Sequence, residues 1–119
     1  MSNRQNSRLI AIVDDDESLK SALQDLIESD GLSTLCFRSA EQFLNSEARH
    51  KAACLIAGIR FELQATLKAE GCRIPIIFIT AHGDAEMRTL AMRDGALEFL
   101  AKPFDDAVLL EIVHAALAR

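Results

Sequence analysis

The sequence predicts a doubly wound α/β fold, in which helices cover both faces of a five-stranded parallel sheet. Short apolar runs alternate with segments of helical periodicity along the 119 residues, as expected when a sheet is buried on both sides. Half of the residues are hydrophobic, which is enough for one core without disulfides or metals. We therefore expect one domain over residues 8–119, preceded by a disordered segment at residues 1–7.

The expected strands are apolar runs too short to be helices, at residues 9–13, 32–37, 54–59, 75–79 and 97–100. The first run stops at the acidic residues 14–16. Apolar residues at helical spacing then continue to Gly31, a residue type that commonly ends helices. Ser39 and Gln42 have the spacing of a capping box, which predicts the start of a short second helix.

Three more helices are expected in the second half of the chain. One begins near Phe61 and ends at Gly71, and the next is capped by Asp84 and ends at Gly95. The last follows residue 103 and repeats apolar residues at helical spacing. Because consecutive strand–helix units form right-handed crossovers, we expect a flavodoxin-like sheet with strand order 2-1-3-4-5.

Composition excludes several classes of function. With 18 acidic and 13 basic residues the net charge is −5, which argues against direct nucleic acid binding. The cysteines are odd in number, with no C-x-x-C spacing, as in proteins that keep free thiols in a reducing cytosol. No apolar run is long enough to span a membrane. We expect a cytoplasmic protein that binds neither nucleic acid nor membranes.

In parallel sheets of this kind, functional groups gather at the carboxyl ends of the strands. Here those ends carry the acidic residues 14–16, Gly58, the pair Thr80-Ala81, and Lys102. Residues 8–118 thereby resemble a bacterial response-regulator receiver domain of the FixJ-like branch. The segments that carry the resemblance are 12–17 (Ile-Val-Asp-Asp-Asp-Glu), 78–84 (Phe-Ile-Thr-Ala-His-Gly-Asp) and 102–104 (Lys-Pro-Phe).

The resemblance implies phosphoryl transfer from a histidine kinase to an aspartate at the end of the third strand, assisted by Mg²⁺. The roles it assigns are metal binding for Asp14 and Asp15, the switch hydroxyl for Thr80, the small neighbour for Ala81, the phosphate-binding cation for Lys102, and the aromatic switch for Phe99. Taken alone, Phe99 is interpreted as a core residue and the acidic run as a helix cap.

The sequence departs from the family at the acceptor. Gly58 occupies the position of the phosphorylated aspartate, and glycine has no side chain that could attack phosphorus. No aspartate occurs between Asp30 and Asp84, so a shifted alignment supplies no acceptor. The segment that follows is about six residues shorter than the family pattern, still a reasonable connection. We therefore expect a pseudo-receiver that is not an enzyme.

Such a domain would act by protein contact. The expected partners are a histidine kinase, another regulator or an output domain, with a possible homodimer through the fourth helix, fifth strand and fifth helix. No cofactor is expected, and Mg²⁺ would bind weakly at most, at Asp14 and Asp15, because one carboxylate is missing. Lys102 is expected to pair with Asp14 or Asp15 instead.

Two alternatives remain open from the sequence. A receiver could take phosphate at an atypical acceptor, Asp14 or Asp15. A different class is a small Mg²⁺-dependent phosphohydrolase that uses Asp14 and Asp16, by resemblance to haloacid-dehalogenase-type enzymes. The chain is short for that fold and lacks its cap.

Overall fold

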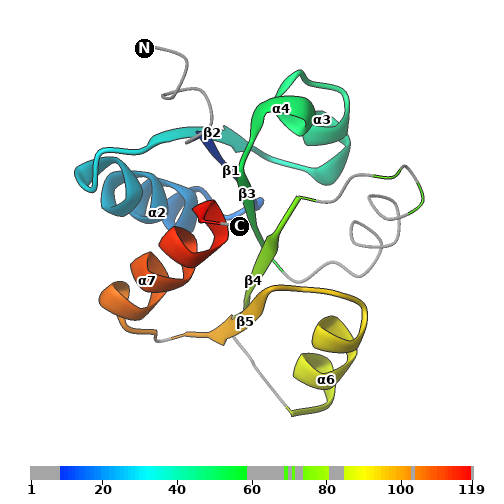
Figure 1. Ribbon diagram of the computed structural model, residues 1–119. Helices are drawn as coiled ribbons and strands as arrows, with labels where there is room; N and C mark the ends of the chain where they lie inside the picture. Colours follow the sequence, from blue (N-terminus) through cyan, green and yellow to red (C-terminus); the bar gives the residue numbers. More distant parts are fainter. Residues whose placement is uncertain are drawn as a thin grey trace.

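The computed structural model describes residues 9–58, 69, 71, 74–80, 85–102 and 104–118 (Figure 1). Its sheet consists of β1 (Leu9–Val13), β2 (Ser33–Phe37), β3 (Cys54–Gly58), β4 (Ile76–Thr80) and β5 (Glu98–Ala101). All neighbours pair in parallel, in the order β2-β1-β3-β4-β5. The predicted doubly wound sheet and its strand order are confirmed.

The described helices are α2 (Glu17–Ser29), α3 (Ala40–Leu44), α4 (Ala48–Lys51), α6 (Ala85–Arg93) and α7 (Asp106–Leu117). The fourth and fifth helices expected from the sequence correspond to α6 and α7. The short helix α4 was not predicted, because one turn contains no apolar repeat to reveal it. The helix expected from Phe61 lies outside the described residues apart from positions 69 and 71, and so does Asp84, the expected cap of the next helix.

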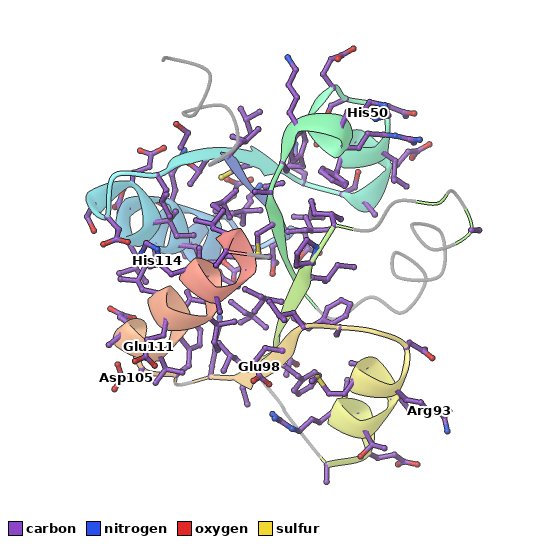
Figure 2. All side chains as sticks on the ribbon, in the orientation of Figure 1. His50, Arg93, Glu98, Asp105, Glu111 and His114 are labelled. Carbon is purple, nitrogen blue, oxygen red and sulfur yellow. The ribbon has the colours of Figure 1, made fainter. Side chains whose placement is uncertain are left out.

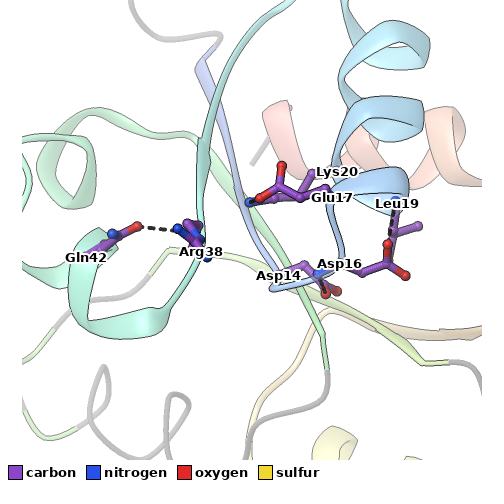
Figure 3. Close-up of polar contacts among 7 residues, drawn as sticks. All are labelled: Asp14, Asp16, Glu17, Leu19, Lys20, Arg38 and Gln42. Carbon is purple, nitrogen blue, oxygen red and sulfur yellow. Dashed lines mark hydrogen bonds and ion pairs between the residues drawn. The ribbon is translucent and has the colours of Figure 1, made fainter.

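Local signals place the helix ends as predicted. The hydroxyl of Ser39 accepts the N–H of Gln42 at 3.2 Å, while the Gln42 side chain accepts the N–H of Arg38 at 2.9 Å (Figure 3). Gly31 and Gly95 follow α2 and α6 with φ of 86° and 103°, a conformation that favours glycine. The Ser39 N-cap and both glycine stops are confirmed, whereas the Gln42 side chain bonds the N–H of Arg38 and not that of Ser39, as a full capping box requires.

Each face of the sheet has its own core (Figure 1). On one face, α2 and α7 pack side chains such as Ile27 and Leu109 against Ile10 and Ile12. On the other face lie α3, α4 and α6, whose buried residues are Phe43, Ala48 and Ala91. Because all the strands are parallel, their carboxyl ends lie at the same end of the sheet. The candidate site residues lie at these carboxyl ends.

Within the described part of the chain, no helix combines the length and the apolar character needed to cross a lipid bilayer.

Candidate functional site

The acidic run after β1 forms the start of α2. Asp14 is half-buried, and its Oδ1 accepts the backbone N–H of Asp16 at 2.9 Å. Asp16 is the N-cap of α2, and its Oδ1 accepts the N–H of Leu19 at 3.1 Å (Figure 3). A cap of this kind satisfies an N–H group that the helix leaves open. The helix-cap interpretation is confirmed for Asp16.

The Asp14 carboxylate lies against Gly58, which ends the neighbouring strand β3. A Cβ built on Gly58 would be 2.8 Å from Oδ2 of Asp14 and 3.4 Å from its Cγ. Cβ atoms essentially never approach another heavy atom closer than 3.0 Å. A side chain at residue 58 would therefore require the Asp14 carboxylate, the end of a flexible side chain, to shift, whereas glycine fits beside it as it stands.

Thr80 and Lys102 lie at the ends of the next two strands. Thr80 ends β4, and its carbonyl oxygen accepts the N–H of Lys102 at 2.8 Å. Phe99 on β5 is 3% exposed and belongs to the same core cluster as Phe78, so its interpretation as a core residue is confirmed. The sheet places these three predicted residues on adjacent strands, whereas Ala81 lies outside the described residues.

The ion pair predicted between Lys102 and Asp14 or Asp15 stays a prediction. Among the described residues, no ion pair joins Lys102 to Asp14. Strands β3 and β4 lie between β5 and β1, so the ends of β1 and β5 are roughly 14 Å apart.

Asp14 and Asp15 are the predicted Mg²⁺ ligands. Mg²⁺ requires near-octahedral oxygen coordination, in which carboxylates usually take part. In this structure one oxygen of Asp14 binds an N–H and the other faces Gly58. Within the described residues, no three His, Cys, Asp or Glu side chains gather closely enough to hold a metal. Weak Mg²⁺ binding at Asp14 and Asp15 therefore stays a prediction.

Lys20 is a buried charge that the sequence analysis missed. It is 5% exposed, and its Nζ donates to Oε2 of Glu17 at 3.0 Å, next to the acidic run (Figure 3). A signal for its burial was present, because Lys20 precedes Leu23 by three residues and Ile27 by seven. Those spacings place it on the apolar face of α2.

Two further ion pairs join elements that are distant in the sequence. His114 of α7 bonds Asp30, the C-cap residue of α2, and Figure 2 shows His114 beside that helix. Arg88 of α6 pairs with Glu98 of β5 at 3.0 Å. No sequence signal could have found either pair, because each depends on how the helices are placed around the sheet.

The two described cysteines, Cys36 and Cys54, are protonated thiols with raised pKa values. Burial raises the pKa of the Cys54 thiol to about 12, and desolvation also raises the pKa of the half-buried Cys36. Both are free thiols, as predicted, and Cys72 lies outside the described residues. The reactive form of cysteine is the thiolate, so a thiol with a raised pKa is a poor nucleophile.

A sheet of order 2-1-3-4-5 with an acidic run after β1 and Thr80 and Lys102 at later strand ends defines a receiver-type signalling domain. The sequence profile of the Response regulator receiver domain matches residues 10–114, so the chain belongs to that family. It is the receiver domain of a two-component response regulator.

Individual relatives agree. The chain is 43% identical to the response regulator protein TodT of Pseudomonas putida over 123 residues, covering 98% of this chain and 53% of TodT. Among solved structures, the response regulator StyR is 38% identical with a TM-score of 0.83, covering 92% of this chain and 59% of that one. FixJ-N is 32% identical with a TM-score of 0.82, covering 93% and 94%. The chain spans about half the length of the curated relatives it matches.

Proposed function

We propose that this receiver domain signals without phosphorylation at the end of its third strand. The observation that carries the proposal is the contact between Asp14 and Gly58, at the position that the resemblance assigns to the acceptor. Gly58 offers no nucleophile, and the Asp14 carboxylate lies 2.8 Å from the point where a Cβ of residue 58 would be, so it takes the space that an acceptor side chain would need.

The alignment with TodT is compatible with a shortened segment. It runs over 123 residues, more than the 119 of this chain, so this chain has gaps relative to TodT. We propose that these gaps fall after the third strand, where the sequence departs from the family pattern. The same segment supplies a backbone carbonyl to the metal in the family pattern, so its shortening weakens the Mg²⁺ site as well.

Without a phosphoryl group, the domain would act by contact with another protein through α6, β5 and α7. Val108, in the first turn of α7, is 41% exposed and is one of two large apolar side chains exposed among the described residues. Acidic side chains flank it at Asp105, Asp106 and Glu111 (Figure 2 labels the first and the last). The proposed partners are a histidine kinase, another regulator or an output domain, or a second copy of the chain.

The test is the intact mass of the protein after incubation with acetyl phosphate and Mg²⁺, with FixJ-N treated in parallel as a receiver of similar fold. We expect no added phosphoryl group on this chain. A mass gain that maps to the end of β3 would overturn the proposal. A gain abolished by Asp14→Asn or Asp15→Asn would instead establish the atypical acceptor, and the matched pair of variants shows which carboxylate is used.

The same proposal holds that the domain is not an enzyme. Hydrolysis of a generic phosphomonoester such as p-nitrophenyl phosphate, with Mg²⁺ present, tests this directly. We expect no turnover above the buffer rate. Turnover that is lost in Asp14→Asn would place the chain with the phosphohydrolases instead.

A further inference from the structure

The open edge of the sheet at β5 carries a closed polar network. Strand β5 is the last in the sheet order, so one of its sides has no neighbouring strand. On α6, Nη1 of Arg88 donates to the carbonyl oxygen of Phe99 at 2.9 Å, and Nη2 donates to Oε1 of Glu98 at 3.0 Å. The same Oε1 accepts the backbone N–H of Phe99 at 3.0 Å. Both main-chain polar groups of Phe99 are thus bound by side chains.

This network matters because an edge strand normally presents unpaired N–H and C=O groups to solvent or to another chain. At Phe99 the carboxylate of Glu98 covers the donor and the guanidinium of Arg88 covers the acceptor. The forked guanidinium binds both a carbonyl and a carboxylate, which a single-point cation could not do with the same geometry. The edge is therefore closed at this residue.

The Phe99 ring is fixed by the same helix that supplies Arg88. Phe99 is 3% exposed and shares a core cluster with Ala91 and Met87 of α6. Arg88 and Glu98 bind the Phe99 backbone at the open edge of the sheet, and residues of α6 cover its ring. Any outward movement of the Phe99 ring would have to disturb the helix that Arg88 ties to β5.

We infer that Arg88 and Glu98 form a clamp that ties α6 to β5, keeps the Phe99 ring buried and closes this edge of the sheet. The clamp is a conformational device built into the fold, and it acts without any ligand at the carboxyl ends of the strands. The inference stands on α6 and β5 alone and goes beyond the proposed function, since it holds whether or not the domain takes phosphate.

The test is amide hydrogen exchange of Phe99, followed by NMR in the full chain. Arg88→Met keeps the aliphatic stem and removes the guanidinium, so Glu98 loses its counter-charge and turns to water. We expect the Phe99 amide to exchange roughly 3- to 10-fold faster, the factor that corresponds to one net hydrogen bond. Arg93→Met is the matched control, because Arg93 is on the same helix, is exposed, and points away from β5 in Figure 2.

Ring signals of Phe99 give a second readout that a loss of surface charge alone would not move. Arg88→Met should produce a second set of Phe99 ring resonances, and Arg93→Met should not. Equal Phe99 exchange rates and unchanged ring signals in both variants would overturn the clamp.

Salt supplies a test on the unmodified protein. Raising the ionic strength to about 1 M shortens the Debye length to about 3 Å, which weakens a partly exposed ion pair. We expect faster exchange at Phe99 and no change at the buried Ile77 on β4. Exchange at Phe99 that is insensitive to salt would show that the ion pair does not protect this amide, and the inference would fail.

Discussion

The two sides of the sheet differ in how their polar groups are satisfied. Around β1 and β3 the side-chain hydrogen bond is local, from Asp14 to Asp16, and the contact of Asp14 with Gly58 is one of packing only. Around β5 the polar groups join separate elements, as when Arg88 binds the backbone of Phe99. Under the proposed function, the β1–β3 side no longer carries out phosphoryl chemistry, and the side around β5 serves protein contact. This difference indicates that the receiver fold does not depend on the side chain at the acceptor position.

The largest effect is expected when an aspartate is introduced at residue 58, the proposed acceptor position. Gly58→Asp would place a second carboxylate beside Asp14 with no cation between them. The Cβ of the new residue would lie 2.8 Å from Oδ2 of Asp14, so the Asp14 side chain must also move. We expect the free energy of unfolding at pH 7 to fall by about 2–4 kcal/mol, from like-charge repulsion at an effective dielectric constant near 20 together with the displaced contact.

Gly58→Asn is the matched control, because it has nearly the same shape without the charge, and it should cost about half as much. Repulsion raises the pKa of the introduced carboxyl above its unfolded value of about 3.9, so the extra cost is absent at low pH and appears as pH rises above that value. Urea unfolding at pH 3 and pH 7 measures this difference. Efficient phosphorylation of Gly58→Asp by acetyl phosphate would show that the shortened segment matters less than we propose.

Part of this site could be predicted from the sequence and part could not. Apolar runs predict the strands and turn residues predict where they end. Thr80, Lys102 and the acidic run were therefore predicted at the carboxyl ends of the strands, where the structure places them. The contact of Asp14 with Gly58 could not be predicted, because a glycine carries no side-chain pattern. The partner of Lys102 is hard to predict from the sequence, since residues at the carboxyl ends of one sheet can still be three strands apart.

Cys54 lies at the start of β3, at the other end of the strand from Gly58. The pKa of its thiol reports whether this end of the strand is buried. Burial raises the pKa of this thiol to about 12 from its ordinary value of 9.0. The unfolded chain therefore loses the proton first, so stability is intact below pH 9.0 and falls as pH rises from there towards 12. The slope due to this thiol should approach about 1.4 kcal/mol per pH unit.

The measurement is the free energy of unfolding from about pH 8 to pH 11 for the unmodified chain and for Cys54→Ala. The variant is less stable overall because it leaves a small cavity, but its alkaline slope should be flatter. Cys36→Ala, at a half-buried position, should change the slope less. Parallel pH profiles for the unmodified chain and Cys54→Ala would contradict the burial of this strand end.

A smaller effect is expected at the buried charge beside the acidic run. Glu17→Gln removes the counter-charge of Lys20, which is 5% exposed and has no other ion-pair partner among the described residues. Glu17 itself is largely exposed, so solvent replaces part of the lost interaction, and we expect a cost of about 1–2 kcal/mol. Lys20→Met in the Glu17→Gln background should recover most of it, because an apolar side chain suits the position. Thermal unfolding of Glu17→Gln, of Lys20→Met and of the double variant checks this, and additive costs would mean that the two residues are not coupled.

The last prediction is that a phosphoryl analogue causes no conformational change. It concerns the coupling between the ends of β1 and β3 and the residue Phe99 on β5. A ligand shifts a two-state equilibrium only by its difference in affinity for the two states. In a phosphorylated receiver the phosphoryl group supplies that difference to the threonine and the aromatic residue. Under the proposed function no acceptor binds it here, and Phe99 is already buried and held through its own backbone. We therefore expect Thr80 and Phe99 to keep one conformation when beryllofluoride and Mg²⁺ are titrated and amide shifts are followed by NMR.

Shifts confined to residues 14–16 would report weak metal binding and leave the proposal intact. Saturable shifts that move together from Thr80 through Phe99 into α7 would show that the two ends are still coupled, and both the proposed function and the comparison drawn from it would then be wrong.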